Sequence, residues 1–212
     1  MSIKIHEIFF SIQGEASRVG LPTVFVRLTG CPLRCGYCDT AYAFHGGDLF
    51  TVDEIVTKVA SFGVKRVTVT GGEPLAQKEC LALLKALCDQ DYDVSLETSG
   101  AMDITQVDDR VAIILDVKTP GSGEQGRNLW SNIKLLKPKD EVKFVLCDQG
   151  DYAWAKQVLS EHGIHDICPV LFSPVYGQLQ PQDLAEWILA DKLQVRLQIQ
   201  LHKVLWGEVP GK

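Results

Sequence analysis

The sequence predicts an α/β protein whose sheet forms an incomplete βα barrel of about six strands, preceded by a short N-terminal β extension. Short β-branched or apolar runs alternate with segments of helical periodicity, a pattern typical of βα units around a mostly parallel sheet. An eight-fold barrel usually needs about 250 residues, whereas this chain has 212 and supplies six or seven strand-like runs. We therefore expect one open, partial barrel in a single domain, residues 1–212.

The predicted strands share an enrichment in Val, Ile, Leu and Phe. In chain order they are Thr23–Leu28, Arg66–Thr70, Asp93–Glu97, Val111–Val117, Glu141–Cys147, Ile167–Phe172 and Gln194–Leu201. Ahead of them, Ile5–Ile12 is apolar and β-prone. We expect it to form a small hairpin or an added strand that covers one edge of the sheet.

The predicted helices place apolar residues at intervals of three and four. Thr51 is placed to cap the first helix, with Glu54 completing a capping box, and Pro181 suits the first position of the last helix. The Pro-, Gly- and Ser-rich stretch Thr119–Gly126 is the only flexible insert of any length, and we expect a mobile surface connection rather than a lid. The four helices are Val52–Ser61, Leu75–Cys88, Tyr152–His162 and Pro181–Ala190.

Composition excludes several classes of protein. The chain carries 21 Lys and Arg against 27 Asp and Glu, a net charge of −6, so it lacks the basic balance of proteins that grip nucleic acid. Its longest apolar runs, Cys80–Leu84 and Val111–Leu115, are far shorter than the roughly 20 residues that cross a bilayer. The first residues reach an acid at Glu7 without an apolar export segment. We expect a cytoplasmic protein that binds neither nucleic acid nor membrane.

Three of the seven cysteines stand close together, in the spacing C-x3-C-x2-C directly after the first predicted strand: Cys31, Cys35 and Cys38. Three thiolates in one short loop can surround a single inorganic centre, and the neighbouring Gly30 and Gly36 allow tight turns around it. Four irons held by three thiolates leave one iron open to an external ligand such as S-adenosylmethionine (SAM).

A zinc site is the alternative interpretation of this loop, with His45 as the fourth ligand of a Cys3His arrangement. The remaining cysteines lie in predicted helices or at the ends of apolar strands, and we expect them to be buried hydrophobic residues. They are Cys80, Cys88, Cys147 and Cys168.

A second motif follows the next predicted strand, in the sequence from Thr70 to Pro74. Its glycines let a ligand approach the backbone, and Glu73 offers a carboxylate to an ammonium group. A strand-to-helix turn with Pro at the first helical position explains the same residues structurally. Because parallel strands open their clefts at the carboxyl ends, we expect this turn and the cysteine loop to border one ligand site.

Together these motifs resemble the radical SAM superfamily. The resemblance rests on Cys31, Cys35 and Cys38 with the aromatic Tyr37, and on the Gly-Gly-Glu-Pro turn that follows the next predicted strand. Within it, five segments resemble the 7-carboxy-7-deazaguanine synthase family. They are Phe10–Glu15, Arg27–Gly30, Cys38–Thr40, Glu97–Gly100 and Gln200–Lys203. The resemblance extends from near residue 5 to near residue 203 and implies a partial barrel of about six βα units.

The resemblance implies a carbon–nitrogen lyase that converts 6-carboxy-5,6,7,8-tetrahydropterin to 7-carboxy-7-deazaguanine with loss of ammonia, in queuosine biosynthesis. It implies a 4Fe–4S cluster, SAM and Mg²⁺ as cofactors. A flavodoxin or a ferredoxin-type protein would donate electrons, and the enzyme would be a homodimer.

The resemblance also assigns roles residue by residue. The cluster would be held by Cys31, Cys35 and Cys38, and Mg²⁺ by the hydroxyl of Thr40. The substrate would contact Ile12, Gln13, Gly14, Arg27 and Thr70, with the Arg27 guanidinium on its carboxylate. SAM would contact Tyr37, Cys38, Asp39, Gly72, Glu73, Asp116, Val117, Lys118 and Ser173.

The chain departs from the family in two places. The family often has Ser-Pro-Lys where this chain has Asp116, Val117 and Lys118, and a tail from Val204 to Lys212 follows the His-Lys pair. That tail leaves a substrate role for Lys212 unsupported. His202 fits either the core or the site.

Two other functions compete with this interpretation. A glycyl-radical-enzyme activating protein shares the cysteine loop and the Gly-Gly-Glu-Pro turn, but its peptide substrate needs an open groove, whereas a pterin carboxylate needs a buried guanidinium such as Arg27. A zinc-stabilised binding module without catalysis would be colourless and would lose its fold on chelation.

Overall fold

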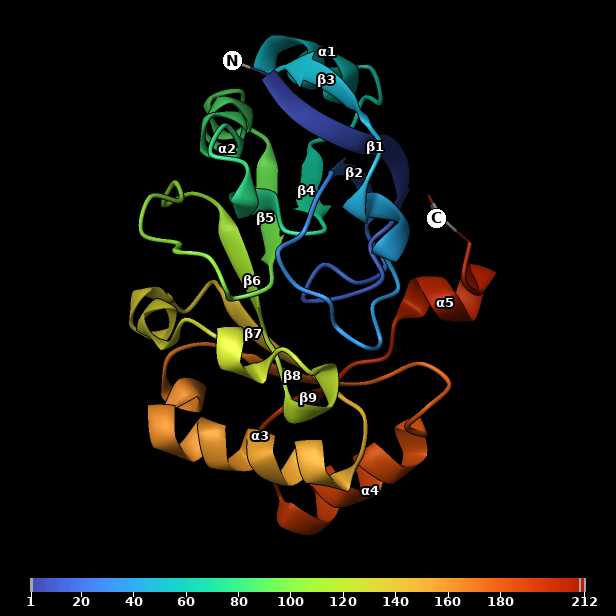
Figure 1. Cartoon of the computed structure of the whole chain (residues 1–212), viewed down its shortest axis with the longest axis vertical. Helices are drawn as coiled ribbons and strands as arrows, with labels where there is room; N and C mark the ends of the chain where they lie inside the picture. Colours follow the sequence, from blue (N-terminus) through green and yellow to red (C-terminus); the bar gives the residue numbers. More distant parts are fainter. Residues whose placement is uncertain (1, 210, 212) are drawn as a thin grey trace.

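The computed structural model describes residues 2–209 and 211, and its centre is one open sheet (Figure 1). Nine strands of the described residues pair in the order β3-β1-β2-β4-β5-β6-β7-β8-β9. They are β1 Ser2–Ile12, β2 Pro22–Leu28, β3 Asp48–Thr51, β4 Arg66–Gly71, β5 Asp93–Thr98, β6 Ala112–Val117, β7 Glu141–Leu146, β8 Val170–Pro174 and β9 Arg196–Leu197. From β2 to β9 every neighbouring pair is parallel. The predicted α/β class is confirmed, and the sheet does not close into a barrel.

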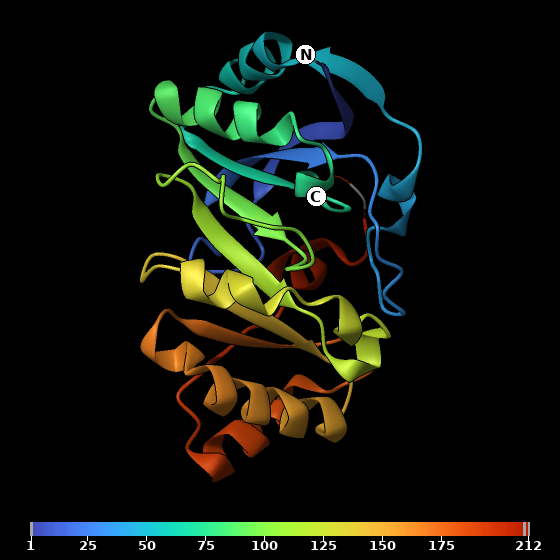
Figure 2. The same cartoon turned by 60° about the vertical axis from the view of Figure 1, so that its left-hand side comes forward.

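Helices lie along the outside of this sheet, as the turned view shows (Figure 2). They are α1 Val52–Ala60, α2 Cys80–Asp89, α3 Gln149–His162 and α4 Pro181–Asp191. The short α5, Leu201–Trp206, lies apart from them, beside the N-terminal turn at Gly14. The capping box at the start of α1 is confirmed: the Thr51 hydroxyl accepts from the Glu54 amide, and the Glu54 carboxylate accepts from the Thr51 amide. Pro181 occupies the start of α4 as predicted. No helix in the described residues is long and apolar enough to cross a membrane.

The N-terminal extension is an added strand, as expected. β1 runs antiparallel to β2, from Ile5 opposite Leu28 to Ile12 opposite Pro22. Its first residues also pair with β3, which forms the outer edge of the sheet. β3 was not predicted because this strand is mostly exposed and therefore lacks a buried, alternating face. Its backbone partners come only from the distant β1.

Apolar side chains of the parallel strands pack against α1 to α4 in one large core. All four cysteines outside the loop are buried, as predicted: Cys80, Cys88, Cys147 and Cys168. Packing in this core holds the strands in place, so the carboxyl ends of the parallel strands have fixed positions relative to one another.

Two predicted elements begin later than expected. The helix predicted from Leu75 starts as a 3₁₀ turn, Pro74–Ala76, and becomes α-helical only at Cys80. The strand predicted from Ile167 starts at Val170, because the Cys168 amide donates back to the Ile164 carbonyl and continues the turn after α3.

The last predicted strand, Gln194–Leu201, shortens to the two residues of β9. The Gln198 amide still donates to the Phe172 carbonyl, at 2.9 Å, but the Leu201 amide donates to the carbonyl of Gly14, at 3.0 Å. The chain leaves the sheet there and starts α5, which lies against the N-terminal turn. This departure depends on a contact between residues 187 positions apart in the chain, so no local pattern could have predicted it.

Candidate active site

A cavity of about 590 Å³ opens at the carboxyl ends of the parallel strands. It gathers most of the residues that the sequence singled out, although they come from five different segments of the chain. Those that line it are Ile12, Gln13, Gly14, Arg27, Cys31, Cys35, Tyr37, Cys38, Asp39, Thr40, Thr70, Gly72, Asp116 and Lys118. Three predicted residues do not line it: Glu73, Val117 and Ser173.

The three cysteines sit in the loop between β2 and β3. Gly30 begins the loop with a φ of +96°, a conformation that favours glycine. The Cys38 amide donates to the Cys35 carbonyl at 3.2 Å, and the Leu33 amide donates to the Cys31 sulfur at 3.4 Å. The first bond closes the turn of the loop, and the second is the kind of hydrogen bond that the sulfur ligands of iron–sulfur clusters receive in proteins. Three thiols on one cavity wall therefore fit a cluster that needs three protein ligands.

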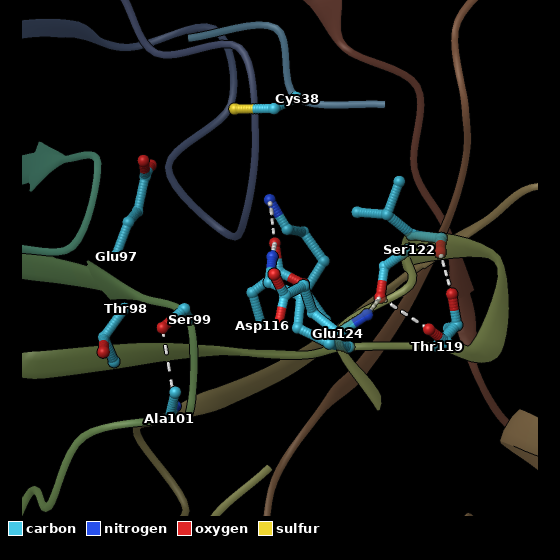
Figure 3. A network of polar contacts seen from close by, with 12 residues as sticks. Cys38, Glu97, Thr98, Ser99, Ala101, Asp116, Thr119, Ser122 and Glu124 are labelled. Atoms are coloured by element: carbon cyan, nitrogen blue, oxygen red, sulfur yellow. Dashed lines mark hydrogen bonds and ion pairs between the residues drawn. The ribbon is translucent and has the colours of Figure 1, made fainter. Parts of the chain in front are cut away.

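A second segment supports this loop from the side. The Gly36 amide donates to the Ser122 carbonyl at 3.0 Å, and the Arg34 amide donates to the Glu124 carboxylate at 2.5 Å. Figure 3 shows Ser122 with its hydrogen bonds to Thr119 and Glu124. The Thr119–Gly126 stretch, expected to be a mobile connection, is thus hydrogen-bonded to the cysteine loop.

The buried Asp151 holds the same stretch from below. Its carboxylate accepts from the Thr119 hydroxyl at 2.9 Å, the Gly121 amide at 2.8 Å and the Cys147 amide at 2.9 Å. Gly121 is required here, because a Cβ at this position would lie 2.5 Å from Asp151 Oδ2. The segment is anchored at both ends, which explains how a Gly-rich sequence adopts one conformation.

The zinc alternative needed His45 beside the three thiols. His45 is exposed and does not line the cavity. Across residues 2–209 and 211, no group of three His, Cys, Asp or Glu side chains is placed to hold a single metal ion.

The Gly-Gly-Glu-Pro turn packs directly on the cysteine loop. A Cβ on Gly72 would lie 2.3 Å from the Gly30 carbonyl oxygen and 2.7 Å from Cys31 Cβ, so glycine alone permits this approach. The Glu73 amide donates to the same Gly30 carbonyl at 2.8 Å. The motif thus joins two strand ends and narrows the cavity between them.

The Glu73 carboxylate, predicted to meet an ammonium group, is not among the groups that line the cavity. It is fully buried and accepts hydrogen bonds from the Leu75 amide at 2.9 Å, the Thr98 hydroxyl at 2.9 Å and the Ser99 amide at 2.6 Å. Figure 3 places Thr98 and Ser99 at the end of β5, next to Glu97. Glu73 therefore holds the end of β5 against the turn after β4.

Polar residues on the cavity side of the strands form a continuous network near the predicted substrate residues. Gln13 Nε2 donates to Thr68 Oγ1 at 3.1 Å and to Glu97 Oε1 at 3.2 Å. Thr70 Oγ1 donates to Glu97 Oε2 at 2.9 Å. Arg27 lies beside Thr70 in the pairing of β2 with β4. Amide, hydroxyl, carboxylate and guanidinium groups thus meet at one wall, as recognition of a polar heterocycle with a carboxylate requires.

The end of β6 shows why Val117 is absent from the cavity. Successive residues of a strand point to opposite faces: Asp116 and Lys118 face the cavity, and Val117 packs in the core. Lys118 Nζ lies 3.1 Å from Asp116 Oδ2. Burial opposes the charge of Lys118, but Asp116 outweighs it and raises the pKa of the lysine. Ser173, on β8, is buried behind this layer.

The sequence reasoning missed Lys143, a cation of the cavity lining whose side chain is 12% exposed. Its Nζ lies 2.6 Å from Glu15 Oε2 and 3.4 Å from Asp116 Oδ2. Burial opposes its charge, but Glu15 and Asp116 outweigh burial and hold the pKa of Lys143 well above its usual value. One feature of the sequence could have revealed it: a lysine lies inside the apolar strand β7. Lysine is rarely buried in such a strand unless an acidic side chain pairs with it.

The C-terminal segment from Gln200 to Lys203 also lines the cavity. Gln200 Nε2 donates to Glu15 at 2.7 Å and to Asp39 at 3.2 Å, and Lys203 Nζ lies 3.0 Å from Asp39 Oδ2. His202 lines the cavity, and a Cβ on Gly14 would lie 2.1 Å from its Nδ1. Of the two places considered for His202, the structure selects the site. Glu208 reaches the cavity as well, whereas Lys212 lies outside the described residues.

Known proteins agree with this geometry. The pattern of the Radical SAM superfamily matches residues 25–170. The 7-carboxy-7-deazaguanine synthase of Chlorobaculum tepidum is 48% identical, over 97% of this chain and 94% of that protein. The enzyme of the same name from Koribacter versatilis is 42% identical, over 96% of this chain and 97% of that protein.

Solved structures share the fold. The crystal structure of QueE from Escherichia coli covers 95% of both chains with a TM-score of 0.79, at 21% identity. Streptococcus suis SuiB bound to S-adenosylmethionine covers 81% of this chain and 48% of that chain, with a TM-score of 0.58 at 16% identity. The chain therefore belongs to the radical SAM superfamily and, within it, to the 7-carboxy-7-deazaguanine synthase family, the radical SAM lyases of queuosine biosynthesis.

Proposed function

We propose that the chain converts 6-carboxy-5,6,7,8-tetrahydropterin to 7-carboxy-7-deazaguanine with loss of ammonia. One observation carries the proposal: a single cavity is lined both by the three cysteines and by Gln13, Arg27 and Thr70. A radical generated at the cysteine loop would thus form in the same cavity as a pterin held by Gln13, Arg27 and Thr70.

The family implies a 4Fe–4S cluster and SAM, and the residues present fit both. Cys31, Cys35 and Cys38 would hold the cluster, whose chemistry is the one-electron reductive cleavage of SAM. The chain's own part is to orient SAM and to keep water from the site. The residues we assign to that task are Tyr37, Cys38, Asp39, Gly72, Asp116 and Lys118, with Val117, Ser173 and Glu73 acting through the backbone positions that they fix.

The N-terminal turn would hold the pterin ring, through the Gln13 amide and the backbone of Ile12 and Gly14. Gln13 already donates to Glu97 and Thr68, so its amide group is fixed in one orientation before a ligand arrives. Thr70 would line the same pocket. The Arg27 guanidinium, only 13% exposed, would take the carboxylate, since a buried guanidinium and a carboxylate form paired, charge-assisted hydrogen bonds.

We also propose Mg²⁺ beside the Thr40 hydroxyl, which lines the cavity. Magnesium usually keeps several waters and takes few protein ligands, so one hydroxyl is a sufficient anchor. Asp39 is not offered to the ion, because Lys203 and Gln200 occupy its carboxylate. We further propose that the protein is a homodimer of single-domain subunits in the cytoplasm. A flavodoxin or ferredoxin-type protein would be its electron donor.

The test is an anaerobic assay of the iron- and sulfide-reconstituted protein with SAM, a reductant, magnesium and the carboxypterin. Equal amounts of ammonia and the deazapurine are expected. If 5′-deoxyadenosine accumulates without the deazapurine, the substrate assignment is wrong. A colourless protein that holds zinc and leaves SAM intact would contradict the whole proposal.

A further inference from the structure

The Arg27 guanidinium is held on three sides before any substrate binds. Its Nε lies 2.7 Å from Glu7 Oε1. Its Cζ lies 5.8 Å from the centroid of the Phe9 ring and 5.9 Å from that of the Tyr42 ring, both within range of cation–π attraction. Such contacts fix both the plane and the direction of a guanidinium.

The fold brings these residues together in a defined way. Glu7 is directly opposite Arg27 in the pairing of β1 with β2, and Phe9 lies two residues further on, on the same face of β1. Tyr42 comes from the turn after the cysteine loop, and its hydroxyl donates to Glu7 Oε1 at 2.9 Å. Burial raises the pKa of Tyr42 to about 12, so this hydroxyl remains a hydrogen-bond donor at neutral pH.

Glu7 leaves one edge of the guanidinium free. A carboxylate can bind arginine through Nε and one terminal nitrogen, or through both terminal nitrogens. Glu7 occupies Nε, and within residues 2–209 and 211 no hydrogen bond or ion pair engages the two terminal nitrogens. A ligand carboxylate is thus restricted to the end-on arrangement.

We propose that Glu7 is a positioning residue that sets Arg27 for end-on binding of the substrate carboxylate, and that Tyr42 sets Glu7. The inference rests on the proposed function, because it takes the ligand of Arg27 to be the carboxypterin. Glu7 itself does not line the cavity and acts only through Arg27.

A competing acid explains why Arg27 needs such restraint. Glu97 lines the same cavity and is partly buried. With Glu7 removed, the guanidinium is free to turn toward Glu97, which would neutralise it in an orientation unsuited to the ligand. Glu7 holds Arg27 at the β1 side of the cavity, so that its terminal nitrogens remain available.

Steady-state kinetics at saturating SAM test the proposal. We expect Glu7→Ala to raise the KM for the carboxypterin about tenfold, the cost of misplacing one charge-assisted pair, with kcat changed less than about twofold. Glu7→Gln should lie near wild type, because its amide oxygen still accepts from Nε. Tyr42→Phe, a mild change for which folding is not in question, should raise KM about twofold. Glu161→Ala, on the exposed surface of α3, is the matched control.

Inhibition by tetrahydropterin without the carboxylate separates positioning from general damage. Its inhibition constant should be the same for wild type and Glu7→Ala, because it has no group for Arg27. An unchanged KM in both Glu7→Ala and Tyr42→Phe would overturn the inference, as would equal weakening of both pterins. If the wild-type protein does not turn over the carboxypterin, the proposed function fails; if it does and Glu7 has no effect, only the inference fails.

Discussion

The two faces of β4, β5 and β6 have the same backbone and opposite chemistry. On the outer face, Val69, Leu96 and Leu115 are at most 2% exposed and pack under the helices. On the inner face, one residue further along each strand, Thr70, Glu97 and Asp116 line the cavity. The alternation follows directly from the two-residue period of a strand.

The outer face of these strands serves the stability of the fold, and the inner face serves ligand binding. The outer face contributes hydrocarbon burial, which is tolerant of detail and worth roughly 1.5–3 kcal/mol per large side chain. The inner face buries polar groups that are costly unless paired, and its network of Gln13, Thr68, Thr70 and Glu97 supplies the partners. Asp116 Oδ1 is buried there without a protein partner, which leaves an acceptor for a ligand. Changes on the inner face should therefore alter chemistry, and changes on the outer face stability.

The largest expected effect comes from the cysteine loop above the inner face. Cys35→Ala should abolish cluster assembly and reduce turnover below about 1% of wild type, because in the described part of the chain no other thiol lines the cavity beside Cys31 and Cys38. Iron content and the visible absorbance of the reconstituted protein measure the loss.

Cys80→Ala is the matched control on the outer side, where the thiol is fully buried in α2. It should keep the cluster and the activity and lose about 1 kcal/mol of stability. Full activity in Cys35→Ala would contradict the cluster assignment.

Leu96→Ala tests the outer face alone. The side chain is 0% exposed in the main core, so its truncation should lower the free energy of unfolding by about 2–5 kcal/mol. Urea denaturation measures this change, and KM values of the folded protein should stay constant. Leu189→Ala, 75% exposed on α4, should change stability by less than about 0.5 kcal/mol. A Leu96→Ala protein with intact stability and poor substrate binding would reverse the division between the faces.

Arg27→Lys sharpens the comparison on the inner face. Lysine cannot reproduce the planar fork of arginine, so the KM for the carboxypterin should rise about tenfold while uncoupled cleavage of SAM continues at the wild-type rate. Product and 5′-deoxyadenosine are quantified in parallel. Arg66→Lys, on the partly exposed start of β4, serves as control. Unchanged substrate affinity would show that Arg27 has only a structural role.

The smallest expected effect is on stability in acid, where the free energy of unfolding should differ between wild type and Glu15→Gln. Burial opposes the charge of Glu15, but the ion pair with Lys143 outweighs it and lowers the pKa of the carboxyl. A lowered pKa in the folded state contributes stability above the unfolded value, about 4.3, and this contribution is lost as pH falls through the folded pKa. Unfolding free energies from pH 6 to pH 3 should therefore fall less steeply in Glu15→Gln. Parallel curves would show that the pair does not stabilise the fold.

Local signals in the sequence were sufficient for much of this molecule. The capping box of Thr51 and Glu54 depends on residues three apart, and the outer-face strands depend on burial alone, so both were predictable. β3 and the true length of β9 were not, because their backbone partners lie in distant segments. The partners of the Glu73 carboxylate were not predictable for the same reason: Thr98 and Ser99 are a full βα unit away.

By itself, the sequence determined the α/β class, the cysteine spacing, the glycine-rich turn and the family, since each is written in residues close together or in a fixed order along the chain. Only the tertiary structure decided which of these residues meet. Lys143 becomes a cavity cation because β7 places it opposite Glu15 and Asp116, and Arg27 becomes a directed guanidinium because β1 places Glu7 across from it. Electrostatic and hydrogen-bond partners are set by distance in space, which no periodicity in the chain records.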